Sequence, residues 1–210
     1  MPDVALFPIP NLVAFPGTVV PLHVFEPRYR QMVQDCVRDD RMLGVSHVLK
    51  TIHDPGRQES LEQALSSNQA TYKPQHVFSA GRCEIVDTTR DGRILARVRI
   101  SERLVLVEER QSLPYRIVSC RRLEDTVETD ADVGDLRASI NEKLVEIMRD
   151  HNPDLARAMA APPWTTLSAG DYSFRIFQYL RFDADLMQTI LEERSPTARL
   201  ETIWSVLRQT

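Results

Sequence analysis

The residues able to ligate metals or form disulfides are few and scattered along this chain. Its three cysteines, Cys36, Cys83 and Cys120, form no Cys-x-x-Cys pair, which indicates neither a zinc site nor a disulfide framework. The histidines contain no His-Glu-x-x-His motif, and His47 and His53, on either side of an expected bend, come nearest to a ligand pair. We therefore expect no metal. Unpaired thiols are typical of a reducing compartment, which predicts a cytoplasmic protein.

Motifs for nucleotide hydrolysis and proteolysis are absent from the 210 residues. A phosphate-binding loop needs Gly-x-x-x-x-Gly-Lys-Ser/Thr, and no glycine here precedes a Lys-Ser or Lys-Thr pair. A Ser–Lys dyad needs a lysine that burial keeps neutral, but Lys50 and Lys73 lie in a polar stretch and Lys143 in a charged helix. The 30 carboxylates single out no acid–base pair. We predict a non-enzymatic protein with no catalytic residue and no cofactor.

Large aromatic side chains beside prolines are the best candidates for binding. Phe15 and Phe25 lie in a proline-interrupted N-terminal segment, where they either form a surface for apolar polypeptide or belong to a core. Trp164 follows a Pro-Pro pair, where it either plugs the space between two parts of the chain or contacts a partner. Phe15, Phe25 and Trp164 are therefore the candidate polypeptide-binding residues.

Charge is divided unevenly along the chain, whose net charge is −4. Residues 82–122 carry ten arginines against six acids, whereas residues 123–210 carry nine bases against sixteen acids. One interpretation is that these are ordinary solvent-facing sides of strands and helices. The alternative is an arginine-rich sheet over 82–122 that binds nucleic acid or an acidic partner. Both interpretations stay open at this point.

Composition and length are those of an ordinary globular protein. Hydrophobic residues make up 42% and charged residues 27%, which is enough for one core or two smaller ones. No run approaches the roughly 20 apolar residues that span a bilayer. The first residues, Met1-Pro2-Asp3, have neither a basic segment nor an apolar core, so no export signal is expected.

Short elements are expected in the N-terminal third. Prolines divide its apolar residues into runs that suit short strands and bends. Pro27 suits the first position of a helix reaching Arg38, whose apolar stripe is Tyr29, Met32, Val33, Cys36 and Val37. Residues 42–49 suit a buried strand. Residues 50–76 are polar and predict an excursion with a turn at 54–56 and a weak helical turn around 61–65.

The middle of the chain alternates with period two and the last part has a helical period. Strands are predicted over 77–86, 94–100, 104–107 and 115–123, with a hairpin at Asp91-Gly92. Because no helical crossovers separate them, they favour an antiparallel barrel or folded sheet. Beyond Asp125 an apolar stripe predicts a helix over 132–150, and Pro162-Pro163 ends this region. Three later helices are expected to begin after N-caps at Ser168, Asp183 and Ser195.

Two segments resemble a known family. Residues 6–29 read LFPIPNLVAFPGTVVPLHVFEPRY and residues 182–201 read FDADLMQTILEERSPTARLE. The first closely resembles the opening of the Lon N-terminal domain, the substrate-engaging module of Lon-type ATP-dependent proteases, and the second resembles its closing helix pair. The resemblance covers nearly the whole chain and is weakest over 50–76. The chain departs from it at Gly81-Arg82-Cys83, where a small hydroxyl residue commonly follows the glycine, and at Ser101-Glu102-Arg103, where a glycine is common two places before the arginine.

This resemblance implies both a fold and a function. The fold is α+β, with a PUA-like β-barrel or folded antiparallel sheet and one helix over 1–124, then a helical bundle over 125–210. The function is that of a non-enzymatic protein-interaction module, without the ATPase and peptidase of a complete Lon protease. It would bind unfolded or client polypeptide, or an adaptor partner, in protein quality control, in a groove between the β half and the bundle. The identity of the client and the oligomeric state stay open.

Overall fold

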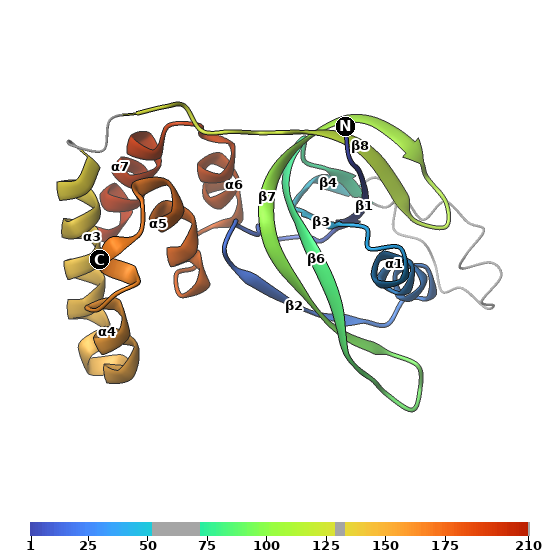
Figure 1. Cartoon of the computed structure of the whole chain (residues 1–210), viewed down its shortest axis with the longest axis horizontal. Coiled ribbons are helices and arrows are strands. Elements are labelled where there is room, and N and C mark those ends of the chain that lie inside the picture. Colours follow the sequence, from blue (N-terminus) through green and yellow to red (C-terminus); the bar gives the residue numbers. More distant parts are fainter. Residues whose placement is uncertain (52–71, 129–132, 210) are drawn as a thin grey trace. The chain divides into compact units, whose positions relative to one another are not determined.

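The computed structural model describes residues 1–51, 72–128 and 133–209, which form two compact units. The sheet unit comprises residues 1–123 with 182–191, and the helical unit comprises residues 124–181 with 192–210. Both units can be followed by colour in Figure 1. From the sequence we expected residues 182–191 within the helical part, whereas in the structure they are compact with the strands.

One six-stranded sheet organises the sheet unit. Its order is β2-β7-β6-β3-β1-β8, and the strands are β1 (Asp3–Pro8), β2 (Val19–Val24), β3 (Leu43–Ser46), β6 (Val77–Thr88), β7 (Ile94–Gln111) and β8 (Arg116–Arg122). The α+β class is confirmed, but the sheet is mixed rather than wholly antiparallel because β1 and β3 run parallel. The first residues of β7 pair with β2 and its later residues pair with β8, so this long strand folds the sheet back on itself (Figure 1).

The length of β7 differs from the prediction. Separate strands were expected over 94–100 and 104–107, but they form one strand, with a register shift against β6 between Ala80 and Gly81. A Cβ atom at Gly81 would lie 1.7 Å from the carbonyl oxygen of Arg99. Glycine is therefore required where the two backbones approach closely at this irregularity.

A second, two-stranded sheet follows β3. The predicted strand over 42–49 is divided at His47 into β3 and β4 (Val48–Thr51), and β4 pairs antiparallel with β5 (Tyr72–Pro74). The turn at 54–56 and the helical turn around 61–65 fall within residues 52–71, outside the described residues.

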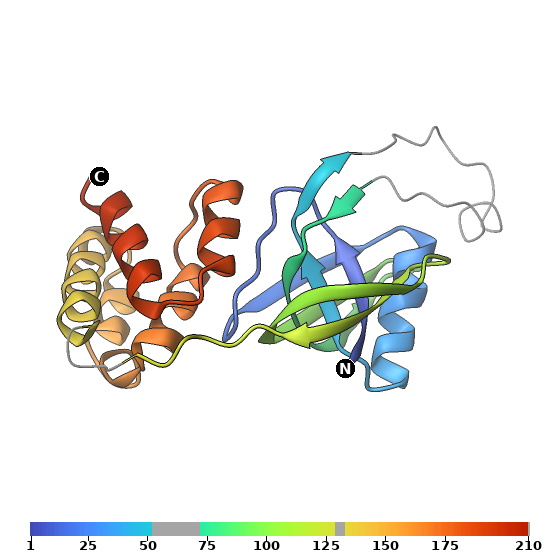
Figure 2. The ribbon, with the colours of Figure 1, turned by 90° about the horizontal axis from the view of Figure 1, so that it is seen from above.

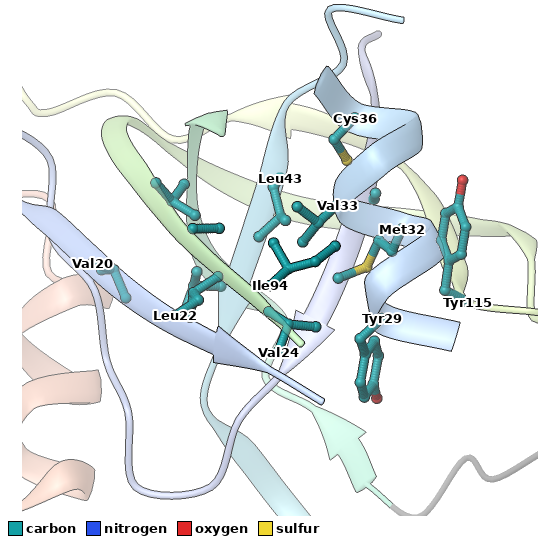
Figure 3. Packing of buried hydrophobic residues seen from close by; sticks show 14 of the residues in the cluster. Val20, Leu22, Val24, Tyr29, Met32, Val33, Cys36, Leu43, Ile94 and Tyr115 are labelled. Carbon is teal, nitrogen blue, oxygen red and sulfur yellow. The ribbon is translucent and has the colours of Figure 1, made fainter. Parts of the chain in front are cut away.

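Helix α1 (Pro27–Arg38) packs against the sheet as predicted. Pro27 stands at its start, and Tyr29, Met32, Val33 and Cys36 are buried. Val37 was expected to face inward but is exposed, because it lies about 100° around the helix from Cys36. The buried side of α1 meets alternate residues of β2 and β7, among them Val20, Leu22, Val24 and Ile94 (Figure 3).

The helical unit contains the segments that position the candidate site. They are α3 (Val133–His151), α4 (Pro153–Met159), η1 (Trp164–Thr166), α5 (Ala169–Arg175), η2 (Ile176–Gln178) and α7 (Pro196–Leu207), which Figure 2 shows from above. The side chains of Ser168 and Ser195 accept bonds from the backbone N–H of Asp171 and Ala198, which confirms both predicted N-caps. Helix α4 was missed, although Asn152 caps it and Pro153 begins it.

Helix α6 (Ala184–Glu192) contacts the strands through its polar side chains and backbone. Asp183 accepts a bond from the backbone N–H of Asp185 at 2.9 Å, which confirms the predicted cap. The Gln188 side chain donates to the carbonyl oxygen of Val77 at 2.9 Å, and Arg103 of β7 donates to that of Leu191 at 2.7 Å. These long-range bonds explain why residues 182–191 belong to the sheet unit.

A buried arginine holds the helical unit together. Arg199 of α7 is completely buried and pairs in two-pronged fashion with Asp125, at 2.7 and 2.6 Å. Its Nε donates to Ser173 Oγ of α5 at 2.9 Å, and its guanidinium lies 4.0 Å from the centre of the Phe174 ring. Its Nη1 also donates to the carbonyl oxygen of Glu193. The Arg199 side chain thus connects three parts of the helical unit: the chain around Asp125, helix α5, and the residues just before α7.

We predict that Met32→Asp lowers the free energy of unfolding by at least about 3 kcal/mol, because it places an unpaired charge in a fully buried position. The control is Gln34→Asp, which puts the same charge on the exposed side of the same helix and should change stability little. Denaturant unfolding followed by far-UV circular dichroism measures both. Equal stability of the two variants would contradict the packing of α1.

Removing Asp125 should destabilise the helical unit more than removing its partner. Asp125→Ala leaves the buried guanidinium of Arg199 without a countercharge, at a cost of about 3–5 kcal/mol. Arg199→Met leaves a carboxylate that is 28% exposed and stays hydrated, so we expect about 2 kcal/mol. Tryptophan emission during unfolding reports this unit, because Trp164 and Trp204 both lie in it. A larger loss from Arg199→Met would show that its packing on Phe174 matters more than its charge.

Candidate polypeptide-binding pocket

The three candidate residues differ in their exposure to solvent. Phe15 is 1% exposed and belongs to the core, which leaves none of its ring free to contact a partner. Phe25 is 63% exposed immediately after β2. Trp164 is half-buried in η1. Phe25 lies in the sheet unit and Trp164 in the helical unit.

A pocket of about 360 Å³ lies beside Trp164. One wall is a face of α3 and the other is the chain from the end of α4 into η1; the lining residues are Arg137, Ala138, Asn141, Glu142, Val145, Arg149, Ala160, Trp164 and Thr165. Those from α3 include Arg137, Asn141, Val145 and Arg149, at intervals of four, because residues at that spacing share one side of a helix. The pocket therefore combines an indole ring and small apolar side chains with an amide, a carboxylate and two guanidinium groups.

Hydrogen bonds fix the two walls of this pocket to each other. The Nδ2 of Asn141 donates to the carbonyl oxygen of Met159 at 2.9 Å, and its Oδ1 accepts a bond from the Tyr172 hydroxyl at 3.3 Å. Nη1 of Arg137 donates to the carbonyl oxygens of Thr165 and Leu167, at 2.9 and 2.8 Å. Since these side chains join α3 to the chain on both sides of Trp164, the pocket is formed before any partner arrives.

Neighbouring aromatic rings orient Trp164. Its ring centre lies 6.0 Å from that of Tyr172 in an edge-on arrangement, and 5.7 Å from that of Tyr179. Burial raises the pKa of the Tyr172 hydroxyl, which keeps this residue neutral and able to donate to Asn141. The indole is thus held on one side by aromatic rings while part of it stays accessible.

Arg137 also borders a second, more polar pocket of about 350 Å³. This one is lined by Gly134, Arg137, Thr165, Thr166, Leu167, Ser168 and Ala169. The two pockets share Arg137 and Thr165. Sequence reasoning missed Arg137 and Asn141, although their spacing of four residues on an amphipathic helix is a signal that they share a side of α3.

Besides Phe25, the sheet unit exposes apolar side chains on β2 and β7. Leu95 of β7 faces the same outer side of the sheet as His23, its partner on β2, and Val19 lies further along β2. Val19 and Leu95 are also exposed. Phe25, Val19 and Leu95 are therefore exposed apolar side chains of the sheet unit.

Most arginines of residues 82–122 are already paired. Eight of the ten are engaged: Arg82 with Asp40, Arg93 with Asp91, Arg97 and Arg99 with Glu84, Arg110 with Glu108, Arg116 with Glu109, Arg122 with Glu102, and Arg103 with the Leu191 carbonyl oxygen. Carboxylates pair with seven of these guanidinium groups, which reduces the positive charge that the sheet offers to a phosphate backbone.

The cysteines and histidines gather into no reactive centre among the described residues. Burial raises the pKa of Cys36 and Cys120 to about 12 and that of Cys83 to about 11, so their thiols stay protonated and unreactive near neutral pH. No group of three or more potential metal ligands occurs in the described parts of the chain. None of the helices described is long and apolar enough to cross a membrane.

Comparisons with known proteins agree on one family. Residues 3–209 match the family described as the ATP-dependent protease La (LON) substrate-binding domain. The fold is similar to that of the Lon N-terminal domain protein from Xanthomonas campestris, with 22% identity over 98% of each chain and a TM-score of 0.65. It is also similar to the N-terminal domain of the Mycobacterium avium complex Lon protease, with 14% identity over 98% of each chain and a TM-score of 0.70.

The comparison with curated proteins gave no match. The two structural likenesses establish the fold, and the family match extends over nearly all of the 210 residues. The chain therefore belongs to the LON substrate-binding domain family.

Proposed function

We propose that this protein binds segments of polypeptide substrates and that the Trp164 pocket receives one of their apolar side chains. The observation that carries the proposal is a partly exposed indole in a preformed pocket, within a chain of the LON substrate-binding family. Tryptophan is enriched among the residues that dominate the energy of protein interfaces, because its large ring buries apolar area and loses little conformational freedom.

The pocket suits a peptide in size and in chemistry. A volume of about 360 Å³ lies at the small end of ligand pockets, where one large side chain rather than a whole cofactor fits. Val145, Ala138 and Ala160 offer apolar contacts beside the indole, while the polar groups at the edge can bond to a peptide backbone. Contact through one side chain gives modest affinity, which suits many different clients.

We include Phe25 as a second apolar contact, on the sheet unit. Its ring is 63% exposed, and removing an aromatic ring of this size from water is favourable. Exposed apolar contacts of this kind suit an unfolded chain, and they also allow an adaptor protein as partner. We propose that this binding serves protein quality control without catalysis by this chain, in the cytoplasm, as the free thiols favour.

Nucleic acid is the less favoured partner, because the arginines of the sheet are largely paired with carboxylates. A salt titration separates the two functions. Phosphate contacts make affinity fall steeply with salt, whereas apolar contacts in a pocket do not.

We predict that Trp164→Ala reduces the affinity for an unfolded polypeptide, such as reduced carboxymethylated lactalbumin, by about tenfold, because it removes one apolar anchor. It should cost less than about 3 kcal/mol of folding stability, since the indole is only half-buried. Emission of the remaining Trp204 follows the unfolding of the helical unit, and fluorescence anisotropy of the labelled polypeptide measures its binding.

Val127→Ala is the matched control, because Val127 is fully exposed in the same unit and lines neither pocket. Unchanged binding by Trp164→Ala together with native stability would show that the pocket is not the binding site. A loss of stability well above 3 kcal/mol would instead identify Trp164 as part of the core.

A further inference from the structure

We propose that Arg137 is a receptor for a carboxylate and that the pocket selects polypeptide segments in which an aspartate or glutamate lies next to a large apolar residue. This inference rests on the proposed function, because it specifies which substrates the Trp164 pocket takes. Three observations support it: the hydrogen bonds of Arg137, the charges around the two pockets, and the position of Arg137 in the lining of both pockets.

The guanidinium of Arg137 is held in place but only partly used. An arginine has five N–H donors, two of them on Nη1. Nη1 donates to the carbonyl oxygens of Thr165 and Leu167, which fixes the plane of the group. Nε and Nη2 have no hydrogen-bond partner among the described residues, and together they form the fork that matches the two oxygens of a carboxylate.

Charge around the site favours an acidic ligand. Arg137 and Arg149 line the Trp164 pocket, against one lining acid, Glu142. Arg137 and Arg149 form no ion pair within the part of the chain that the structure describes, in contrast to the paired arginines of the sheet. The lining is thus locally basic, although residues 123–210 carry an excess of acids. A carboxylate placed at Arg137 gains a strong bond that a neutral amide cannot replace.

The carboxylate is assigned to a side chain within the substrate and not to its chain end. Arg137 and Thr165 border both pockets, with the apolar lining of Trp164 on one side and the threonine and serine residues on the other. A bound chain therefore has room to continue in both directions from the carboxylate. The apolar neighbour of the acidic residue enters the Trp164 pocket, and the polar pocket takes the continuing chain.

The test uses the full chain with Trp204→Phe, in which Trp164 is the one remaining tryptophan and its emission reports the pocket. Four probes are titrated at low salt: acetyl-Gly-Ser-Gly-Phe-Asp-Gly-Ser-Gly-amide, the same peptide with Asn for Asp, the same peptide with Ala for Phe, and acetyl-Gly-Ser-Gly-Phe-Asn with a free carboxyl end. We expect the Phe-Asp peptide to bind about tenfold more tightly than the Phe-Asn peptide. We also expect it to bind more tightly than the Ala-Asp peptide and the free-ended peptide.

The protein variants are Arg137→Gln and Arg137→Lys, with Arg157→Gln as the matched control, because Arg157 is an exposed arginine of the same unit that lines neither pocket. Arg137→Gln should abolish the preference for Asp over Asn, and Arg137→Lys should restore little of it, because an ammonium group lacks the fork. Since Arg137 also supports the wall of the pocket, affinity for the Phe-Asn peptide measures any loss of shape in each variant. The preference for Asp over Asn, compared between the unmodified and variant chains, isolates the carboxylate bond.

Each contrary outcome has a separate meaning. Equal affinity for the Phe-Asp and Phe-Asn peptides, or a preference that survives in Arg137→Gln, overturns the carboxylate site while the Trp164 pocket stands. Tighter binding of the free-ended peptide overturns the assignment to an internal side chain. No change in Trp164 emission with any peptide overturns the proposed function of the pocket and this inference with it.

Discussion

The helical unit depends on one buried ion pair. Arg199 bonds to Asp125, to Ser173 of α5 and to the chain just before α7, and a cation with no exposed surface is stable only when all its neighbours are in place. Because it fixes α5, it also fixes Tyr172, which orients both the Trp164 ring and the Asn141 side chain. The order of the pocket thus derives from a contact that does not line it.

The sheet unit depends on a different constraint, which is the bend in the long strand β7. Strand β7 pairs with β2, β6 and β8, and the register shift at Gly81 lets it bend without losing the pairing. Alternate residues of β2 and β7 fill the core beneath α1, and the opposite side of the sheet carries arginines. Acidic residues on the same or neighbouring strands pair with most of the arginines of residues 82–122, although arginines remain in excess there.

Most arginines of the sheet and Arg137 differ in whether a carboxylate already pairs with them, and the proposed carboxylate site rests on this difference. The arginines of the sheet stabilise their own surroundings, whereas Arg137 is held by two backbone carbonyls with its fork still open, beside a partly exposed indole. Such an arrangement suits the proposed recognition of a side chain and its neighbour better than that of a repeating phosphate backbone. Membership of the LON substrate-binding domain family and the geometry of the pocket are consistent with polypeptide as the ligand.

The sequence by itself determined the elements whose signals are local. Pro27 and the stripe from Tyr29 to Cys36 predicted α1, and Ser168, Asp183 and Ser195 predicted the starts of three helices, because caps and periodicity act within a few residues. The α+β class and the family followed from the two segments at the ends of the chain.

Only the tertiary structure decided which polar and aromatic side chains meet. In the tertiary structure Phe15 is buried in the core, and residues 182–191 pack with the strands of the sheet unit. The tertiary structure also brings Arg137 and Asn141 against the chain around Trp164. These contacts join residues 18 to 111 positions apart, as from Asn141 to Met159 and from Val77 to Gln188. Their energy depends on burial and on the geometry of distant segments, which no local pattern of residues specifies.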